Sequence, residues 1–139
     1  MQIEELLNHA VFTRTTNDIK VSVIPTYLEE HSDPAEDHYV WAYTVQVENG
    51  SNQKVQLINR HWVITDGQGQ IEEVRGEGVV GEQPILEPGE GFRYTSGTSL
   101  RTPTGMMSGE YEMECAGKRI WIDIPVFSLD SPHQLARPN

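Results

Sequence analysis

Residues 76–81 match the pattern G-x-G-x-x-G, which in some proteins binds phosphate groups. In a dinucleotide-binding fold this pattern places a pyrophosphate at the N-terminus of a helix. Here Pro84 and a turn follow and no helical period is present, so the helix which that chemistry requires is missing. We expect Gly76, Gly78 and Gly81 to form a bend between strands. The alternative is a small nest of backbone N–H groups for an anion, which the neighbouring glutamates would oppose.

A second cluster lies in an acidic loop at residues 29–38 and contains Glu29, His31, Asp33 and His38. Carboxylate oxygens suit a hard divalent ion such as magnesium, and imidazole adds affinity for cobalt or nickel. The alternative is a solvated acidic loop between two strands, because no recognised ligand spacing is present.

A third cluster, residues 94–107, mixes hydroxyl groups, glycines and apolar side chains. Loops at one end of a β-sandwich present such side chains to partners, so Thr98, Arg101, Met106 and Met107 are candidate partner-binding residues. The alternative for the two methionines is that they fill gaps at the edge of the core.

The known signatures of nucleophilic and metal-assisted catalysis are missing from the sequence. There is no G-x-S-x-G, P-loop or H-E-x-x-H pattern. Residues 51–54 match S-x-x-K, but they lie in a turn between strands rather than at the start of a helix. His61 alternates outward from an apolar strand face and is expected at the surface. We therefore expect no enzyme and no cofactor.

The composition excludes several kinds of partner. Ten Lys and Arg against twenty-one Asp and Glu give a net charge of -11, which disfavours nucleic acid and anionic membrane surfaces. No apolar stretch approaches the roughly 18 residues that span a bilayer, and the acidic start does not suit a secretory signal. The single Cys115 cannot form an internal disulfide, as a reducing compartment requires. We expect a folded cytoplasmic domain without membrane insertion.

Short strands must position these clusters. Twelve glycines and eight prolines separate short alternating segments, which is typical of an all-β fold, here with seven or eight mostly antiparallel strands. The first predicted strand is Ile19–Leu28, at a sheet edge because of Pro25. Another predicted strand, residues 55–64, places Ile58 on one face with two other core residues, Trp62 and Ile64, and the last predicted strand ends at Pro125. The apolar strand faces predict a set of buried side chains, namely Trp41, Tyr43, Trp62, Phe92, Tyr111, Ile122 and Ile124.

Residues 109–111 resemble the entry to a tyrosine corner, which predicts a hydrogen bond from the Tyr111 hydroxyl to a nearby backbone group. Residues 1–17, with a partly helical period, are expected to be an N-terminal extension. Residues 18–129 are expected to form the domain, and residues 130–139 a C-terminal tail.

Several runs, in this order and spacing, resemble the ApaG family: residues 39–44, 60–66, 74–84, 86–90, 94–97, 105–111 and 124–129. The resemblance covers about residues 18–129 and implies an immunoglobulin-like or fibronectin-type-III-like β-sandwich. It implies small bacterial proteins linked to cobalt and magnesium homeostasis or efflux. In eukaryotes it implies a domain of F-box proteins and of a DNA-polymerase-delta-interacting protein, where protein recognition is the task. It supplies no catalytic residues.

The sequence therefore predicts a non-enzymatic binding module that mediates protein–protein interaction in a pathway linked to cobalt and magnesium homeostasis. The alternative is an accessory protein that binds a divalent metal, or a phosphate or nucleotide at the glycine-rich loop.

Overall fold

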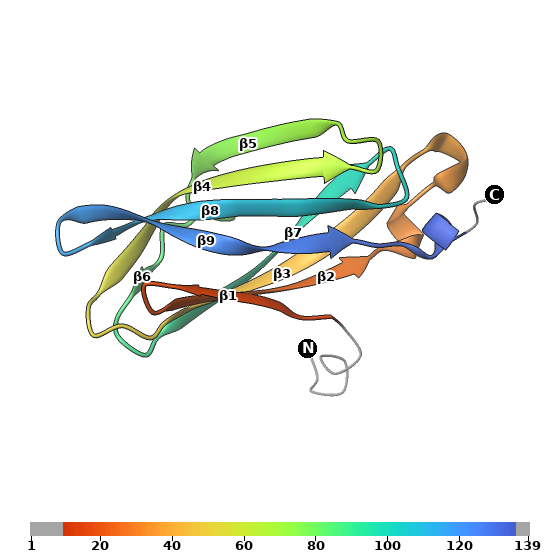
Figure 1. Cartoon of the computed structure of the whole chain (residues 1–139). Helices are drawn as coiled ribbons and strands as arrows, with labels where there is room; N and C mark the ends of the chain where they lie inside the picture. Colours follow the sequence, from red (N-terminus) through yellow and green to blue (C-terminus); the bar gives the residue numbers. More distant parts are fainter. Residues whose placement is uncertain (1–9, 136–139) are drawn as a thin grey trace.

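Two antiparallel sheets pack face to face in the computed structural model, which describes residues 10–135 (Figure 1). The strands are β1 (Phe12–Thr16), β2 (Ile19–Tyr27), β3 (Tyr39–Asn49), β4 (Val55–Asp66), β5 (Ile71–Glu77), β6 (Ile85–Leu86), β7 (Gly91–Leu100), β8 (Gly105–Cys115) and β9 (Lys118–Leu129). The described part of the chain also contains three short 3-10 turns: η1 (Glu29–His31), η2 (Pro34–Glu36) and η3 (Pro132–Leu135). The predicted all-β sandwich is confirmed.

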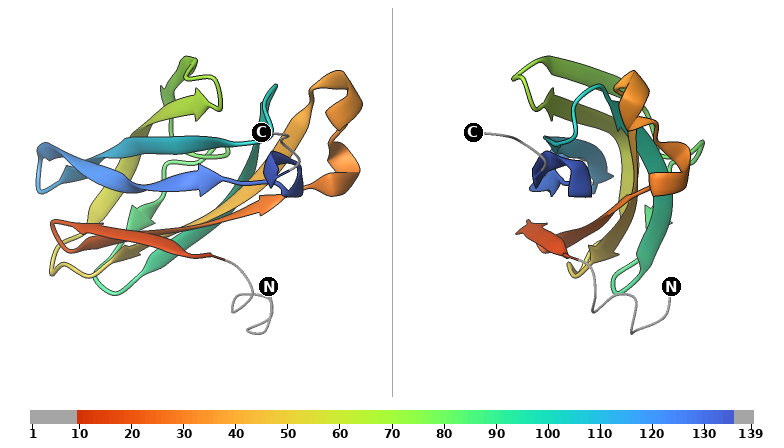
Figure 2. Two further views of the ribbon diagram at one scale, coloured as in Figure 1. Left: turned by 45° about the vertical axis from the view of Figure 1, so that its right-hand side comes forward. Right: turned by 90° about the vertical axis from the view of Figure 1, so that its right-hand side faces the viewer.

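The strand order leaves the two sides of the sandwich different. One sheet has the order β1-β2-β3-β7, and the other has the order β5-β4-β8-β9 with β6 beside β4. Strands β1 and β2 pack against β9, which closes one side. Within residues 10–135, β5 and β7 make no comparably close contact at the other side. Figure 2 shows the two layers from the side and from the end.

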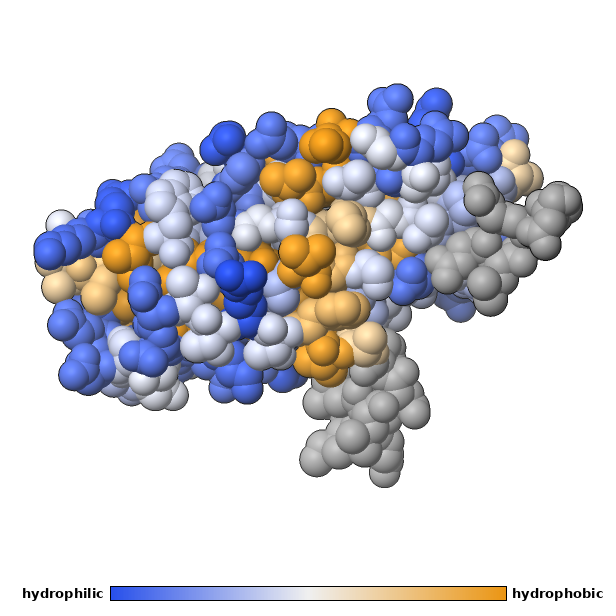
Figure 3. All heavy atoms as spheres, in the orientation of Figure 1, coloured by the Kyte–Doolittle hydropathy of each residue, from blue (hydrophilic) through white to orange (hydrophobic). Residues whose placement is uncertain are grey.

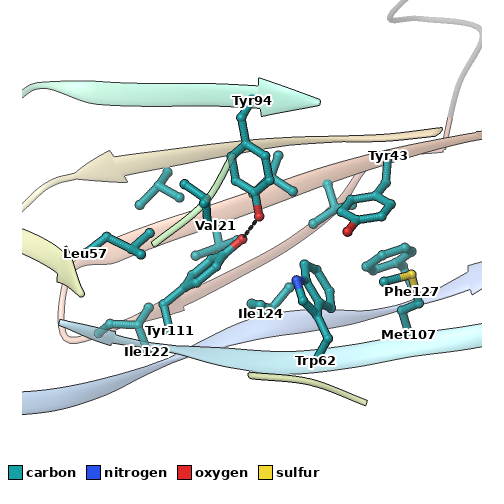
Figure 4. Packing of buried hydrophobic residues seen from close by; sticks show 14 of the residues in the cluster. Val21, Tyr43, Leu57, Trp62, Tyr94, Met107, Tyr111, Ile122, Ile124 and Phe127 are labelled. Carbon is teal, nitrogen blue, oxygen red and sulfur yellow. Dashed lines mark hydrogen bonds between the residues drawn. The ribbon is translucent and has the colours of Figure 1, made fainter. Parts of the chain in front are cut away.

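The core is formed where the apolar faces of both sheets meet. In β3 every second residue from Tyr39 to Asn49 is buried, because successive side chains of a strand point to opposite faces of its sheet. Six of the predicted core residues are buried: Trp41, Tyr43, Trp62, Tyr111, Ile122 and Ile124. Phe92 is only partly buried and packs against the edge of this cluster. Figure 4 shows Trp62, Phe127 and Tyr111 packed between the sheets.

A β-bulge changes the phase of β4. The pairing of β4 with β8 shifts register between Leu57 and Asn59, so Ile58 has no partner on β8. Leu57 is buried with 1% exposure, whereas Ile58 is only partly buried. The prediction that Ile58 shares the core face of Trp62 is therefore wrong, because the extra residue of a bulge reverses the alternation.

The beginning of the domain differs from the sequence analysis. Residues 12–16, assigned there to the N-terminal extension, form β1 and pair with β2. The strand that contains Pro25 is therefore interior, not at an edge. Proline is tolerated there because β1 pairs only with residues 19–23, which leaves the N-side of Pro25 without a neighbouring strand. Residues 1–9, including most of the predicted helical period, lie outside the described residues.

The end of the domain differs as well. Strand β9 continues past Pro125 to Leu129, because Pro125 falls in a second register shift, where β8 and β9 do not pair residue by residue. Beyond the strand, the Trp41 Nε1–H donates to the Asp130 carbonyl at 2.8 Å, and Ser131 is buried. The first residues of the predicted tail are thus packed on the core. Residues 136–139 lie outside the description.

The tyrosine-corner prediction is wrong. The Tyr111 hydroxyl is hydrogen-bonded to the Tyr94 hydroxyl of the opposite sheet rather than to a nearby backbone group. No helix in residues 10–135 is long and apolar enough to cross a membrane.

Candidate functional site: a cleft at the open side of the sandwich

A cleft opens between the sheets on the side where β5 and β7 do not meet. It consists of two adjoining hollows of about 290 and about 210 Å³. Both hollows are lined by Tyr43 from β3, Arg60 and Trp62 from β4, and Ser96 from β7. Thr98 also lines the larger hollow. The cleft thus combines aromatic walls, hydroxyl groups and one cation.

Arg60 enters the cleft from the inward face of β4, in phase with Trp62. Its Nη1 donates to the carbonyl oxygens of Glu77 at 2.9 Å and Gly78 at 3.0 Å. Gly76 makes this position possible, because a Cβ there would lie 2.8 Å from the guanidinium carbon. The first glycine of the motif therefore makes room for an arginine side chain.

The charge of Arg60 is not neutralised by a carboxylate of the described residues. Some arginines on the outer surface do have such partners: Arg14 pairs with Asp123 at 3.0 Å, and Arg75 with Glu73 at 3.5 Å. No ion pair of Arg60 is found within residues 10–135. In a chain of net charge -11, an arginine held by neutral carbonyls alone leaves a local positive charge in the cleft.

Burial dominates the titration of the tyrosines that face this charge. Desolvation raises the pKa of Tyr43, while a hydrogen bond with Ser96 and the positive charge of Arg60 act in the opposite direction. Desolvation also raises the pKa of Tyr94 and Tyr111, and Arg60 again acts to lower both. The guanidinium therefore acts electrostatically on three hydroxyl groups, all of which remain neutral at physiological pH.

The rest of the glycine-rich loop is a tight turn. Val79 and Glu82 exchange two backbone hydrogen bonds of 2.8 and 2.9 Å, and Val80 and Gly81 between them have φ of 42° and 82°. The Gly78 N–H donates to the Ile58 carbonyl at 2.8 Å. Three of the N–H groups that an anion nest would need are thus bound to the protein's own carbonyls. The expectation of a bend between strands agrees with this geometry.

The acidic loop does not gather its candidate ligands. The Glu29 Oε1 lies 3.3 Å from Nε2 of His133, whereas Asp33 and His38 exchange backbone hydrogen bonds with each other. No group of three or more His, Cys, Asp or Glu side chains in the described part of the chain is placed to hold one metal ion. Glu29, His31, Asp33 and His38 therefore form no common centre in this structure.

The four candidate partner-binding residues separate. Thr98 lines the cleft, and Arg101 is exposed at the turn that follows β7. Met106 is 45% exposed on the outer face of β8, whereas Met107 is 1% exposed in the core. The prediction that Met107 is an exposed anchor is therefore wrong, because successive residues of a strand point to opposite faces.

Met106 belongs to an apolar region on the outer face of the second sheet. Figure 3 shows apolar side chains gathered across the middle of this face among hydrophilic ones. The exposed large apolar residues of β5, β8 and β9 are Ile71, Met106, Trp121 and Val126. Beside them His61 lies between two carboxylates, with Nε2 2.8 Å from Glu73 and Nδ1 3.5 Å from Glu110.

Arg60 is the site residue that the sequence analysis missed. The available signal was its phase: it lies two residues before Trp62 and four before Ile64, on the face that those residues direct inward. A charged residue on a core face is rare unless it is paired or functional. Its partners on β5 and the following loop could not be identified from spacing alone.

The chain forms an antiparallel β-sandwich domain with one closed and one open side. The family model of the ApaG domain matches residues 29–115. Protein ApaG of Paramagnetospirillum magneticum is 54% identical over 130 residues, which cover 93% of this chain and 100% of that protein. Protein ApaG of Parvibaculum lavamentivorans is 56% identical over 124 residues, with 88% and 95% covered. The chain belongs to the ApaG family, and the resemblance found in the sequence is confirmed.

Solved structures agree with this assignment. An ApaA protein from Bordetella pertussis superposes with a TM-score of 0.81 at 48% identity, covering 85% of this chain and 97% of that one. A β-glucuronidase of Bacteroides uniformis, at 14% identity and a TM-score of 0.51, shares the fold alone, and the match covers 12% of that enzyme.

Proposed function

We propose that this protein is a non-enzymatic, cytoplasmic binding module that recognises a protein partner at the cleft between β5 and β7. The observation that supports the proposal is the open side of the sandwich, where two adjoining hollows share Tyr43, Trp62, Ser96 and Arg60 as lining residues. We place its task in a pathway linked to cobalt and magnesium homeostasis. That part of the proposal rests on the ApaG resemblance.

The chemistry of the cleft favours binding over catalysis. Its hydroxyl groups have no histidine or carboxylate hydrogen-bonded to them within the described residues, so no activated nucleophile is formed. Aromatic and arginine side chains are the types that contribute most to protein–protein interfaces. Strand β7 ends its sheet, and an edge strand presents unpaired backbone groups to a partner.

Site-directed photo-crosslinking in living cells tests the location. A photoreactive side chain is introduced in place of Ser99, which is exposed on β7 beside the cleft. The same group at Met106 tests the apolar outer face, and at Thr15, exposed on β1, it serves as the control. We expect one discrete adduct from position 99 that excess unmodified protein competes away.

Two results would contradict the proposal. An adduct from position 106 alone would indicate that the partner binds the outer face. Unresolved crosslinked products of equal intensity from all three positions would show that no specific partner is bound. The pathway is tested separately, by the sensitivity of a deletion strain to cobalt. Rescue by wild-type protein supports it, and equal cobalt sensitivity of the deletion strain and its parent would contradict it.

A further inference from the structure

Arg60 carries a positive charge in the cleft that the described protein does not use for an ion pair. We propose that Arg60 binds the carboxylate of an Asp or Glu side chain on an extended segment of the partner, which pairs with the free edge of β7. This inference rests on the proposed function and names the chemistry of its partner. It is carried by the donors of the guanidinium, the charge balance of the cleft and the position of β7.

The Arg60 guanidinium is held in place by two hydrogen bonds, and some of its N–H donors have no partner among the described residues. Both hydrogen bonds that it makes to residues 10–135 come from Nη1, to the carbonyls of Glu77 and Gly78. Nε and Nη2 have no hydrogen-bond acceptor among these residues. A guanidinium offers five donors in a planar fork, and two of them in parallel match the two oxygens of a carboxylate. Because the carbonyls fix its plane, little side-chain entropy remains to be lost when a carboxylate binds.

The charge balance selects a singly charged group. Among residues 10–135, Arg60 is the one cationic residue that lines either hollow, and Glu72 lines the larger hollow with it. A phosphate of charge near -2 would exceed the single positive charge and would face Glu72 as well. A carboxylate of charge -1 matches one guanidinium. The wall also includes the rings of Tyr43 and Trp62, which suit the aliphatic part of an Asp or Glu side chain.

The position of β7 selects an extended segment. Strand β7 pairs with β3 along Gly91–Leu100 and ends its sheet, so its other edge has no strand beside it within the described residues. Its residues Ser96 and Thr98 line the hollows. If a partner strand paired with this edge, every second side chain of that strand would face the space between the sheets, as Ser96 and Thr98 do. An acidic residue in that phase then points to the hollow that contains Arg60.

Two short peptides that differ only in charge test the inference. The probes are acetyl-Val-Thr-Glu-Thr-Val-amide and the same peptide with Gln in the centre, each titrated into isotopically labelled wild-type protein and followed by amide chemical shifts. We expect the Glu peptide to bind about ten-fold more tightly, a difference of about 1.4 kcal/mol. The shifts should include residues 96–99, and added salt should reduce the advantage of Glu.

Matched variants assign the effect to Arg60. Arg60→Met should remove the preference for Glu. Arg93→Met removes an arginine of β7 that is hydrogen-bonded to Gln46 on the outer face, and this variant should leave the preference unchanged. Arg60→Lys keeps the charge but not the fork and should retain part of the preference. If Arg60→Met fails to fold, the wild-type protein still tests the inference. Below about pH 4 the Glu peptide is protonated, so it should no longer bind more tightly than the Gln peptide.

Equal affinity of the two peptides, no binding of either, or a preference that survives in a folded Arg60→Met variant would overturn the inference. The proposed function would then be tested by the crosslink at position 99 alone, because that crosslink does not depend on Arg60. A Glu preference without that crosslink would retain the carboxylate site and reject the protein partner in the cell.

Discussion

The hydroxyl groups of Tyr94 on β7 and Tyr111 on β8 hydrogen-bond to each other inside the core and join the two sheets (Figure 4). Tyr94 is 7% exposed and Tyr111 is fully buried. Each hydroxyl group is the partner of the other, so neither is left unsatisfied in the apolar interior. The pair lies directly behind the Arg60 cleft, since Tyr94 also lines its smaller hollow.

Tyr111→Phe should lower the free energy of unfolding by about 0.5 to 1.5 kcal/mol, the net value of one hydrogen bond. The double variant Tyr94→Phe/Tyr111→Phe should cost less than the sum of the two single variants. In each single variant one buried hydroxyl group loses its partner, whereas the double variant leaves none. Urea unfolding of the four proteins measures this coupling. Strictly additive costs would show that the two hydroxyl groups do not interact.

Stability should decline at alkaline pH because of the same buried tyrosines. Desolvation raises the pKa of Tyr43, Tyr94 and Tyr111 above the ordinary value of about 10. Above about pH 10 the unfolded chain releases these protons while the folded protein retains them, so the free energy of unfolding falls as pH rises. It should be insensitive to these groups below that pH. The Tyr94→Phe/Tyr111→Phe variant should have a shallower decline, and an identical slope would contradict this assignment.

Trp62→Ala should cost about 3 to 5 kcal/mol through lost burial and the cavity that it leaves. The Trp62 ring is 3% exposed and lies edge-on to Tyr43 and Phe127, with ring centroids 5.2 and 6.0 Å apart. Trp121→Ala is the matched control: that ring is 45% exposed, and its loss should change stability by less than about 1 kcal/mol. Equal denaturation midpoints for the two variants would refute the strand phases of β4 and β9.

The sequence predicts the core of this protein well where a strand has one apolar face. Strand β3 alternates without interruption, so its predicted core residues Trp41 and Tyr43 are identified correctly. In β4 the bulge at Ile58 inserts one residue, and nothing in the local letters marks it. Strand β1 is a sheet edge with three exposed residues in its middle, so it lacks the apolar alternation that identifies a strand.

The candidate site could be predicted only in part. The glycine pattern of residues 76–81 correctly indicates an unusual backbone, and Thr98, a candidate binding residue from the sequence, lines the cleft. Arg60, however, acquires its role from carbonyls 17 and 18 residues further along the chain. Such a contact depends on how β5 turns back beside β4, which periodicity within one strand does not specify.

Gly78→Ala should destabilise the protein more than Gly81→Ala does. Both residues have positive φ, 63° and 82°, so each variant carries the left-handed strain of about 1 to 2 kcal/mol. At Gly78 a Cβ would also lie 2.2 Å from the Glu82 carbonyl oxygen, whereas at Gly81 it would enter open space. The resulting clash should add about 1 to 3 kcal/mol at Gly78 alone. Thermal unfolding of both variants makes the comparison, and equal losses would show that the turn adjusts freely.

Nucleotides should give this protein no protection against unfolding. A phosphate at the glycine-rich loop would need free N–H groups, but those of Gly78, Val79 and Glu82 are bonded to protein carbonyls, and no helix follows to supply a dipole. If a site did exist, ATP at 100 times its dissociation constant would raise the free energy of unfolding by about 2.7 kcal/mol. Melting curves with increasing ATP or diadenosine tetraphosphate test this, and magnesium is kept constant throughout. A saturable rise in Tm that disappears in Gly81→Ala, the variant with room for its added methyl group, would establish a nucleotide site at this loop against the present expectation.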